Sequence, residues 1–218
     1  MGVMTRIRKT LENLGSLLEG LYFIGGLLLA KWSPMLMAAG YWIEEALTLG
    51  ATVAALLYIR QRYGRRIFLG RFLFIYGFFF FVHTVFFLIL AGITAKEDRA
   101  SEALFEAFFR LLLGSGFRLP EVIRGEILLT TLIIAGTVSY TMFFRLRGAA
   151  GDASVLINRS FSAVIASHFL IIFGTGAILL TGAPSALAVA LVVVKVLIDM
   201  SGFADRGSPI VSREETEG

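Results

Sequence analysis

The chain has 218 residues, of which 57% are hydrophobic and 17% are charged. The hydrophobic share exceeds the roughly 45–50% of an ordinary soluble domain, so the composition excludes a soluble fold and indicates a lipid-embedded one. The net charge of +4 comes from basic residues at the ends of apolar runs, which is typical of membrane topology and argues against a nucleic-acid partner. Because the chain contains no cysteine, disulfides and thiolate metal sites are excluded.

Six mainly apolar segments follow one another along the chain, and each is interpreted as a transmembrane helix. The predicted spans are about residues 14–30, 34–58, 67–93, 127–144, 161–180 and 185–200. We therefore predict an all-α integral membrane bundle of about six transmembrane helices, which forms a single domain over residues 1–204. Residues 205–218 are polar and are predicted to be a disordered cytoplasmic tail.

The segment between the third and fourth spans is amphipathic rather than apolar. Glu102, Glu106 and Arg110 recur every four residues beside a line of apolar residues, and Gly114 ends the pattern. This pattern predicts a helix at about residues 101–114 that lies in the membrane interface. A short helix that covers the mouth of the bundle fits the same pattern.

The distribution of basic residues predicts the orientation of the bundle. With the N-terminus inside, 13 of the 20 Lys and Arg residues fall on the cytoplasmic side and six fall on the outer side. Because cytoplasmic loops carry an excess of Lys and Arg, both termini are predicted to be cytoplasmic in a multi-pass cell-membrane protein.

Ionisable side chains inside the predicted spans are the candidate functional residues, because each costs a few kcal/mol at membrane depth. Glu44 and Glu45 lie near the middle of the second span, and His83 lies at a similar depth in the third. His168 in the fifth span approaches the same level from the inner side. Glu44 and Glu45 point about 100° apart on their helix, so the sequence leaves open which of them faces the bundle interior.

Two carboxylates and two imidazoles at one depth of the membrane can carry out two kinds of chemistry. They can transfer protons, with Glu44, Glu45, His83 and His168 as the catalytic candidates. They can also bind a divalent metal, with His83, Glu44 and His168 as the ligands. The alternative is structural: one glutamate hydrogen-bonds His83 or a backbone carbonyl and only pins the bundle.

Three further charged residues lie within the spans. Lys195 and Asp199 stand four residues apart on one helix face, and they are predicted to form a structural pair that closes the last span. Glu19, in the first span, is predicted to pair with an arginine of the inner surface.

Several segments occur in a recognisable order. They are Tyr41-Trp42-Ile43-Glu44, Phe79-Phe80-Phe81-Val82-His83, His168, and Pro184-Ser185-Ala186-Leu187 leading to Lys195-Val196-Leu197-Ile198-Asp199. This order resembles a family of prokaryotic multi-pass membrane proteins that is catalogued as a domain of unknown function. The resemblance covers most of the chain and implies the fold and the membrane location, but no activity.

A second resemblance covers fewer residues. Its motif order is Glu44-Glu45, then Phe79 with His83 four residues later, then His168. This order partly resembles the CAAX prenyl protease and bacteriocin-processing family of intramembrane proteases, which implies that paired glutamates and two histidines activate a water. Leu49 stands where that family has arginine, and Ile172 stands where it has Asn or Asp, so an oxyanion or orienting role is left unfilled.

The sequence therefore favours a membrane protein with a midplane Glu/His cluster that binds or passes a proton, a cation or a small polar solute. One alternative is an intramembrane hydrolase with a Glu- or metal-activated water, and another is an accessory or scaffold subunit without a site. The predicted partners are the lipid bilayer and a second copy of the chain. The predicted cofactor, if the cluster binds one, is a divalent metal.

Overall fold

The structure is a computed structural model of the chain. It describes residues 2–64, 69–95, 99–116, 119–149, 153–154, 156–158, 160–161, 164–165, 168–169, 172–173 and 184–201. Three predicted features therefore lie outside the described residues: parts of the predicted fifth span, the Arg-rich loop at residues 65–68 and the predicted tail at 205–218.

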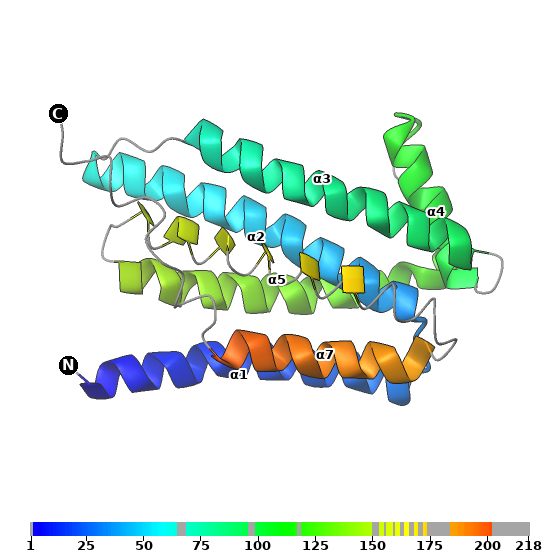
Figure 1. The fold of residues 1–218 in the computed structure, drawn as a ribbon, viewed down its shortest axis with the longest axis horizontal. Coiled ribbons are helices and arrows are strands. Elements are labelled where there is room, and N and C mark those ends of the chain that lie inside the picture. The colour runs from blue at the N-terminus through cyan, green and yellow to red at the C-terminus, as the bar shows by residue number, and fades with distance from the viewer. Residues whose placement is uncertain are drawn as a thin grey trace.

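Every regular element in the described part of the chain is an α-helix, which confirms the all-α part of the predicted fold class. The helices are α1 (Gly2–Leu28), α2 (Pro34–Tyr63), α3 (Leu69–Thr94), α4 (Arg99–Leu112), α5 (Glu121–Ala149) and α7 (Pro184–Ser201). Figure 1 shows α1 and α7 side by side, with α2 and α5 packed above them and α3 along the far side of α2. Short helical pieces between residues 153 and 173 run along the bundle beside α2 and α5.

Among the described residues, three helices are long and apolar enough to cross a membrane: Met35–Tyr63, Leu69–Gly92 and Ile123–Arg147. The apolar stretches Leu14–Leu28 and Ala188–Ile198 are shorter. The described residues thus support a membrane protein with three long apolar helices. They do not establish the predicted count of six spans.

The helices extend beyond the apolar segments that predicted them. Helix α2 continues from the predicted end at residue 58 to Tyr63, and α5 covers residues 121–149 instead of 127–144. Helical hydrogen bonds do not require apolar side chains, so an apolar run marks the buried part of a helix and not its ends. At the end of α2, Gly64 adopts a left-handed conformation with φ 64° and its N–H donates to the Arg60 carbonyl at 3.1 Å.

Helix α4 is amphipathic, as the sequence predicted. Its Glu106 and Arg110 form an exposed pair, whereas Phe108 is buried. The Phe108 ring lies 4.8 Å from the rings of both Trp42 and Phe87, so α4 packs across the end of the α2–α3 contact. The position of α4 relative to a membrane interface stays a prediction.

Close helix packing at Gly40 gives a first testable prediction. A Cβ atom at Gly40 would lie 2.5 Å from the Phe23 ring of α1, whereas a Cβ atom at Gly50 of the same helix meets nothing within 4 Å. We expect Gly40→Ala to lower the free energy of unfolding by about 1–3 kcal/mol through overpacking. Gly50→Ala is the matched control and is expected to be neutral or stabilising. Thermal unfolding in detergent compares the two, and equal Tm values would contradict the close α1–α2 approach.

Candidate functional site

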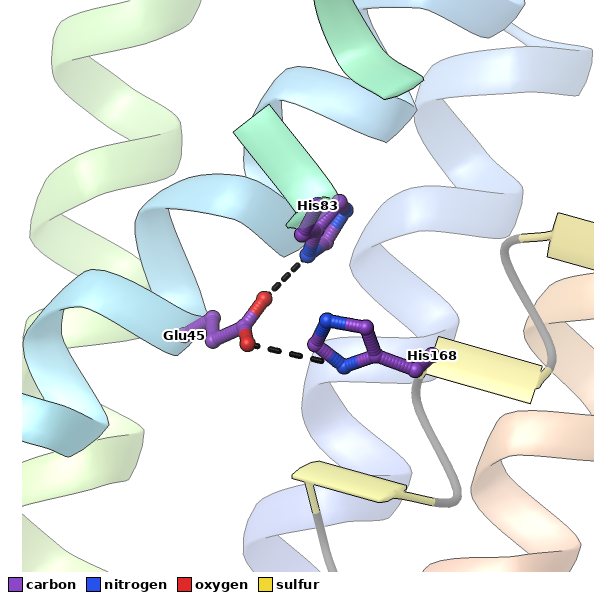
Figure 2. A group of neighbouring side chains, drawn as sticks. All are labelled: Glu45, His83 and His168. Carbon is purple, nitrogen blue, oxygen red and sulfur yellow. Dashed lines mark hydrogen bonds and ion pairs between the residues drawn. The ribbon is translucent and has the colours of Figure 1, made fainter. Parts of the chain in front are cut away.

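Helix α2 presents its two neighbouring glutamates to two different clusters. Glu45 is buried and contacts His83 of α3 and His168, which lies in a helical piece between α5 and α7. Figure 2 shows the Glu45 carboxylate between the two imidazole rings, with one carboxylate oxygen toward each. We call these three residues the Glu45 cluster.

His83 contacts Glu45 through one ring nitrogen only. Its Nδ1 pairs with Glu45 Oε2 in a short contact, and the residue is 3% exposed. Nε2, the other nitrogen of the ring, is buried and has no hydrogen-bond partner among the described residues. Since a carboxylate only accepts, Nδ1 carries the hydrogen of this bond. Nε2 is therefore free to accept a proton.

The α2–α3 register that places His83 opposite Glu45 is held by two further hydrogen bonds. Trp42 Nε1 donates to Thr84 Oγ1 at 2.9 Å, one residue from His83. The Tyr76 hydroxyl donates to the backbone carbonyl of Glu45 at 3.4 Å. These two hydrogen bonds hold α2 against α3 beside the cluster. The positions of Glu45 and His83 therefore do not depend on their own contact alone.

His168 contacts oxygen atoms with both ring nitrogens. Its Nδ1 lies 2.8 Å from the Val164 carbonyl and its Nε2 lies 2.6 Å from the Phe79 carbonyl. A carbonyl oxygen only accepts, so both contacts are hydrogen bonds only when both nitrogens carry a hydrogen. Only an imidazolium ring would donate to both carbonyls, and Nδ1 of the ring lies 3.6 Å from Glu45 Oε1.

The charges of the Glu45 cluster balance in this state. Glu45 supplies one negative charge, the doubly protonated His168 supplies one positive charge, and His83 is neutral. A paired set of this kind is far less costly in a low-dielectric interior than a lone charge. In this state the three side chains need no further ion for charge balance.

The same three residues offer a donor set that fits a divalent metal. One ligand atom from each of Glu45, His83 and His168 can be chosen so that all lie within 4.8 Å of one another. Two imidazoles and a carboxylate are a known combination for zinc. Both nitrogens of His168 already face carbonyl oxygens, however, so a metal would have to displace one of these hydrogen bonds.

Glu44 belongs to a second cluster on a neighbouring face of α2. Its Oε1 accepts from Lys195 Nζ of α7 at 3.1 Å, and the same Nζ lies 3.8 Å from Oε1 of Glu19 in α1. Glu19 and Lys195 are both buried. We call Glu19, Glu44 and Lys195 the Glu44 cluster.

The structure brings together some of the residues that the sequence proposed and separates others. Glu45, His83 and His168 converge, and the set with a metal-binding geometry contains Glu45 in place of the predicted Glu44. The two glutamates diverge because consecutive residues on a helix point about 100° apart and both directions meet a partner helix.

Two predicted pairings involve α1 and α7. The side chain of Asp199 lies outside the described residues, so its pairing with Lys195 stays a prediction. Glu19, which was expected to meet an arginine, instead contacts Lys195. Its second oxygen lies 3.2 Å from the Thr137 hydroxyl of α5.

Sequence reasoning missed the contact of Lys195 with Glu44 and Glu19. These residues come from three helices and are far apart in the sequence, so helical periodicity does not link them. One feature of the sequence pointed to this contact. Lys195 is the only lysine within the predicted spans, and it lies near the middle of its span, as the carboxylates of Glu19 and Glu44 do in theirs. A charged side chain at that depth requires a partner of opposite charge or a polar backbone group.

Comparison with known proteins places the chain in a family without assigning an activity. The sequence profile described as "Family of unknown function (DUF6498)" matches residues 3–215. This match confirms the resemblance to a family of membrane proteins catalogued as a domain of unknown function. No curated protein and no solved structure matches the chain.

Proposed function

We propose that this chain, which belongs to the DUF6498 family of unknown function, is a multi-pass membrane protein that binds and passes a proton at the Glu45 cluster. One observation carries the proposal: the buried Glu45 carboxylate lies between two imidazoles, of which His168 has two hydrogen-bonded nitrogens and His83 has one open nitrogen. These three side chains bind protons at the ring nitrogens, and Nε2 of His83 can accept one more.

Imidazole suits this task because it accepts a proton at one nitrogen and releases a different proton from the other. A proton that arrives at Nε2 of His83 makes the ring cationic. The ring then gives its Nδ1 proton to Oε2 of Glu45, which becomes a neutral acid and leaves His83 neutral. The Nδ1 atom of His168 faces the other oxygen of Glu45. As a doubly protonated ring, His168 takes no proton in this step; its charge stabilises the carboxylate form of Glu45 that receives the proton from His83.

The depth of the cluster fits a relay within a membrane. Glu45 lies about 5 Å from the middle of α2, and His83 lies about 2 Å from the middle of α3. Neighbouring hydroxyls are engaged in structural bonds: Thr52 is bonded to Ser160 at 3.0 Å, and Thr84 donates to the Phe80 carbonyl at 2.8 Å. The side chains in the described region therefore favour a proton over a larger solute.

The topology that accompanies this proposal has six spans with both termini in the cytoplasm. The three long apolar helices supply three of them, and the apolar parts of α1 and α7 supply two more. The helical pieces that carry His168 supply the sixth. Because such a bundle leaves little room for a water-filled pore, passage through side chains or at the interface of a homodimer is favoured.

Proton flux into liposomes tests the proposal. Purified protein is reconstituted with a pH-sensitive dye inside, and a potassium diffusion potential drives protons inward. We expect the wild-type chain to acidify the lumen, and we expect His83→Gln to slow this by about a hundredfold because it removes the titratable ring. Glutamine keeps an N–H that can donate to Glu45, so the variant is expected to fold.

The matched control is Glu106→Gln on the exposed face of α4, which is expected to leave flux unchanged. Equal flux in wild-type and His83→Gln liposomes would contradict the relay, as would wild-type flux no faster than that of empty liposomes. Far-UV circular dichroism and gel filtration of each variant confirm that the compared samples are folded.

A second candidate function is favoured by one observation. Glu45 and both histidines converge, as a Glu- or metal-activated water in an intramembrane hydrolase requires. Glu44, the other glutamate of the resembling motif, pairs with Lys195. Stoichiometric zinc in the purified protein that disappears in His83→Gln would favour this candidate over the proton relay.

A further inference from the structure

We infer that one end of the bundle is a binding surface for anionic phospholipids, in which Arg71 of α3 and Arg147 of α5 hold the lipid phosphate. The inference goes beyond the proposed relay, because it concerns the outer surface of the bundle and not the Glu45 cluster. It rests on the position of the arginines, on the distribution of acidic residues, and on the exposed apolar faces that lead to Arg71 and Arg147.

The exposed arginines of three helices share one end of the bundle. Figure 1 shows the end of α2, the beginning of α3 and the end of α5 at the same side of the molecule. The exposed arginines at these helix ends are Arg60, Arg62, Arg71 and Arg147. None of their side chains forms an ion pair with another residue that the structure describes. This end therefore presents a positively charged surface.

The acidic residues of these segments lie at the opposite end. Residues 46–95 contain five arginines and residues 127–151 contain two, and neither segment contains Asp or Glu. Residues 96–126, around α4, contain five basic and six acidic residues. In that segment Arg110 and Arg124 lie within 4.0 Å of a glutamate oxygen. The basic residues are therefore balanced by acids around α4, whereas the segments that carry Arg71 and Arg147 contain none.

An exposed apolar stripe on α3 leads to Arg71. Its residues follow at intervals of three or four and are Phe74, Phe78, Phe81, Val85 and Ile89. Arg71 precedes Phe74 by three residues, so it lies on the same face of the helix. At about 1.5 Å per residue, the stripe is about 22 Å long and Arg71 lies about 4–5 Å beyond its end. An acyl chain can lie along this stripe while its phosphate reaches the arginine.

Helix α5 repeats this arrangement. One of its faces exposes, in order, Leu128, Leu132, Gly136, Ser139 and Phe143. Arg147 follows Phe143 by four residues on the same face, and its guanidinium carbon lies 4.3 Å from the centre of the Phe143 ring. This contact holds the charge at the end of the apolar face. The Arg147 side chain forms no hydrogen bond with a described residue, so its N–H groups can donate to an outside acceptor.

The phosphate of an anionic lipid fits both parts of this surface. A guanidinium group pairs with phosphate through parallel hydrogen bonds, and one arginine strengthens binding to an anionic membrane surface about fivefold. A zwitterionic headgroup carries its own cation beside the phosphate, whereas an anionic glycerol headgroup does not. The acyl chains contact the apolar stripes, so a lipid fits the whole surface and inorganic phosphate fits only the arginines.

Electron spin resonance of spin-labelled lipids tests the inference with the full chain in phosphatidylcholine bilayers. Lipids in contact with the protein are motionally restricted, so the spectra give the relative affinity of the protein for phosphatidylglycerol and phosphatidylcholine. We expect the wild-type chain to favour phosphatidylglycerol by about two- to fivefold, since only part of the lipid shell touches an arginine. Arg71→Gln combined with Arg147→Gln should remove at least about half of this preference. Each substitution alone should lower it by a smaller amount.

Arg110→Gln combined with Arg124→Gln is the matched control, because it removes the same net charge from exposed side chains near α4. The control should keep the wild-type preference. Equal losses in the two double variants, or a wild-type chain without the preference, would overturn the inference.

Replacement of sodium chloride by sodium phosphate of equal ionic strength distinguishes a lipid from the free anion. The preference should stay unchanged, and a fall in phosphate would contradict the assignment to lipid. All four substituted arginines are exposed, so the variants are expected to fold, which far-UV circular dichroism checks. Proton flux does not enter these measurements, so a failure of the relay at His83 would leave their outcome unaffected.

Discussion

Replacement of Glu45 by alanine is expected to lower the free energy of unfolding by about 3–5 kcal/mol, the usual cost of removing one member of a buried charged pair. The substitution leaves the His168 imidazolium without its carboxylate and removes the acceptor of the His83 bond. Unfolding by a denaturing detergent, followed by tryptophan fluorescence, measures the change, since Trp42 packs beside this part of α3.

The exposed pair Glu106–Arg110 on α4 provides the matched comparison. Its members are more than half exposed, so Glu106→Ala should cost less than about 1 kcal/mol. If Glu45→Ala were as mild as Glu106→Ala, the two imidazoles would not depend on the carboxylate, and the charge balance assigned to the Glu45 cluster would be wrong.

Lys195→Met is expected to have a comparably large effect at the Glu44 cluster. Removal of the ammonium leaves the buried Glu19 and the partly exposed Glu44 without that cation, which should cost about 3–5 kcal/mol. Addition of Glu44→Gln to this variant should restore most of the lost stability, because two neutral side chains then replace an ion pair. The same unfolding experiment gives both values.

The choice of second substitution makes this prediction specific. Addition of Glu19→Gln to Lys195→Met should restore less stability, because Lys195 Nζ lies 3.8 Å from Glu19 but only 3.1 Å from Glu44. Equal rescue by Glu19→Gln and Glu44→Gln would show that Lys195 is shared evenly between the two acids. No rescue by either would show that Lys195 contributes through packing of its aliphatic stem.

The general architecture followed from the sequence because it depends on simple physical rules. Apolar runs of membrane length predicted helices where α2, α3 and α5 occur, and the four-residue charge repeat predicted the amphipathic α4. Helix ends were less accurate, since hydrogen bonding continues past the last apolar residue until a residue such as Gly64 ends the helix.

The sequence predicted how deep the site residues lie along their helices, but it did not predict which way each side chain points. Helical rise places Glu45, His83 and Lys195 near the middle of their helices. Which glutamate meets the histidines depends on the rotation of α2, and both of its faces meet polar groups. The position of His168 depends on the Phe79 carbonyl, a backbone atom of another helix that no sequence motif specifies.

The protonation states of the two histidines are the centre of this account, and nitrogen-15 NMR measures them directly. The chain contains only two histidines, so histidine labelled on its ring nitrogens gives four signals. In lipid, we predict three protonated nitrogens, of which two belong to His168 and one is His83 Nδ1, and a single unprotonated nitrogen at His83 Nε2. The variant His83→Gln assigns the signals, since only those of His168 remain. An unprotonated or metal-bound nitrogen on His168 would contradict the account.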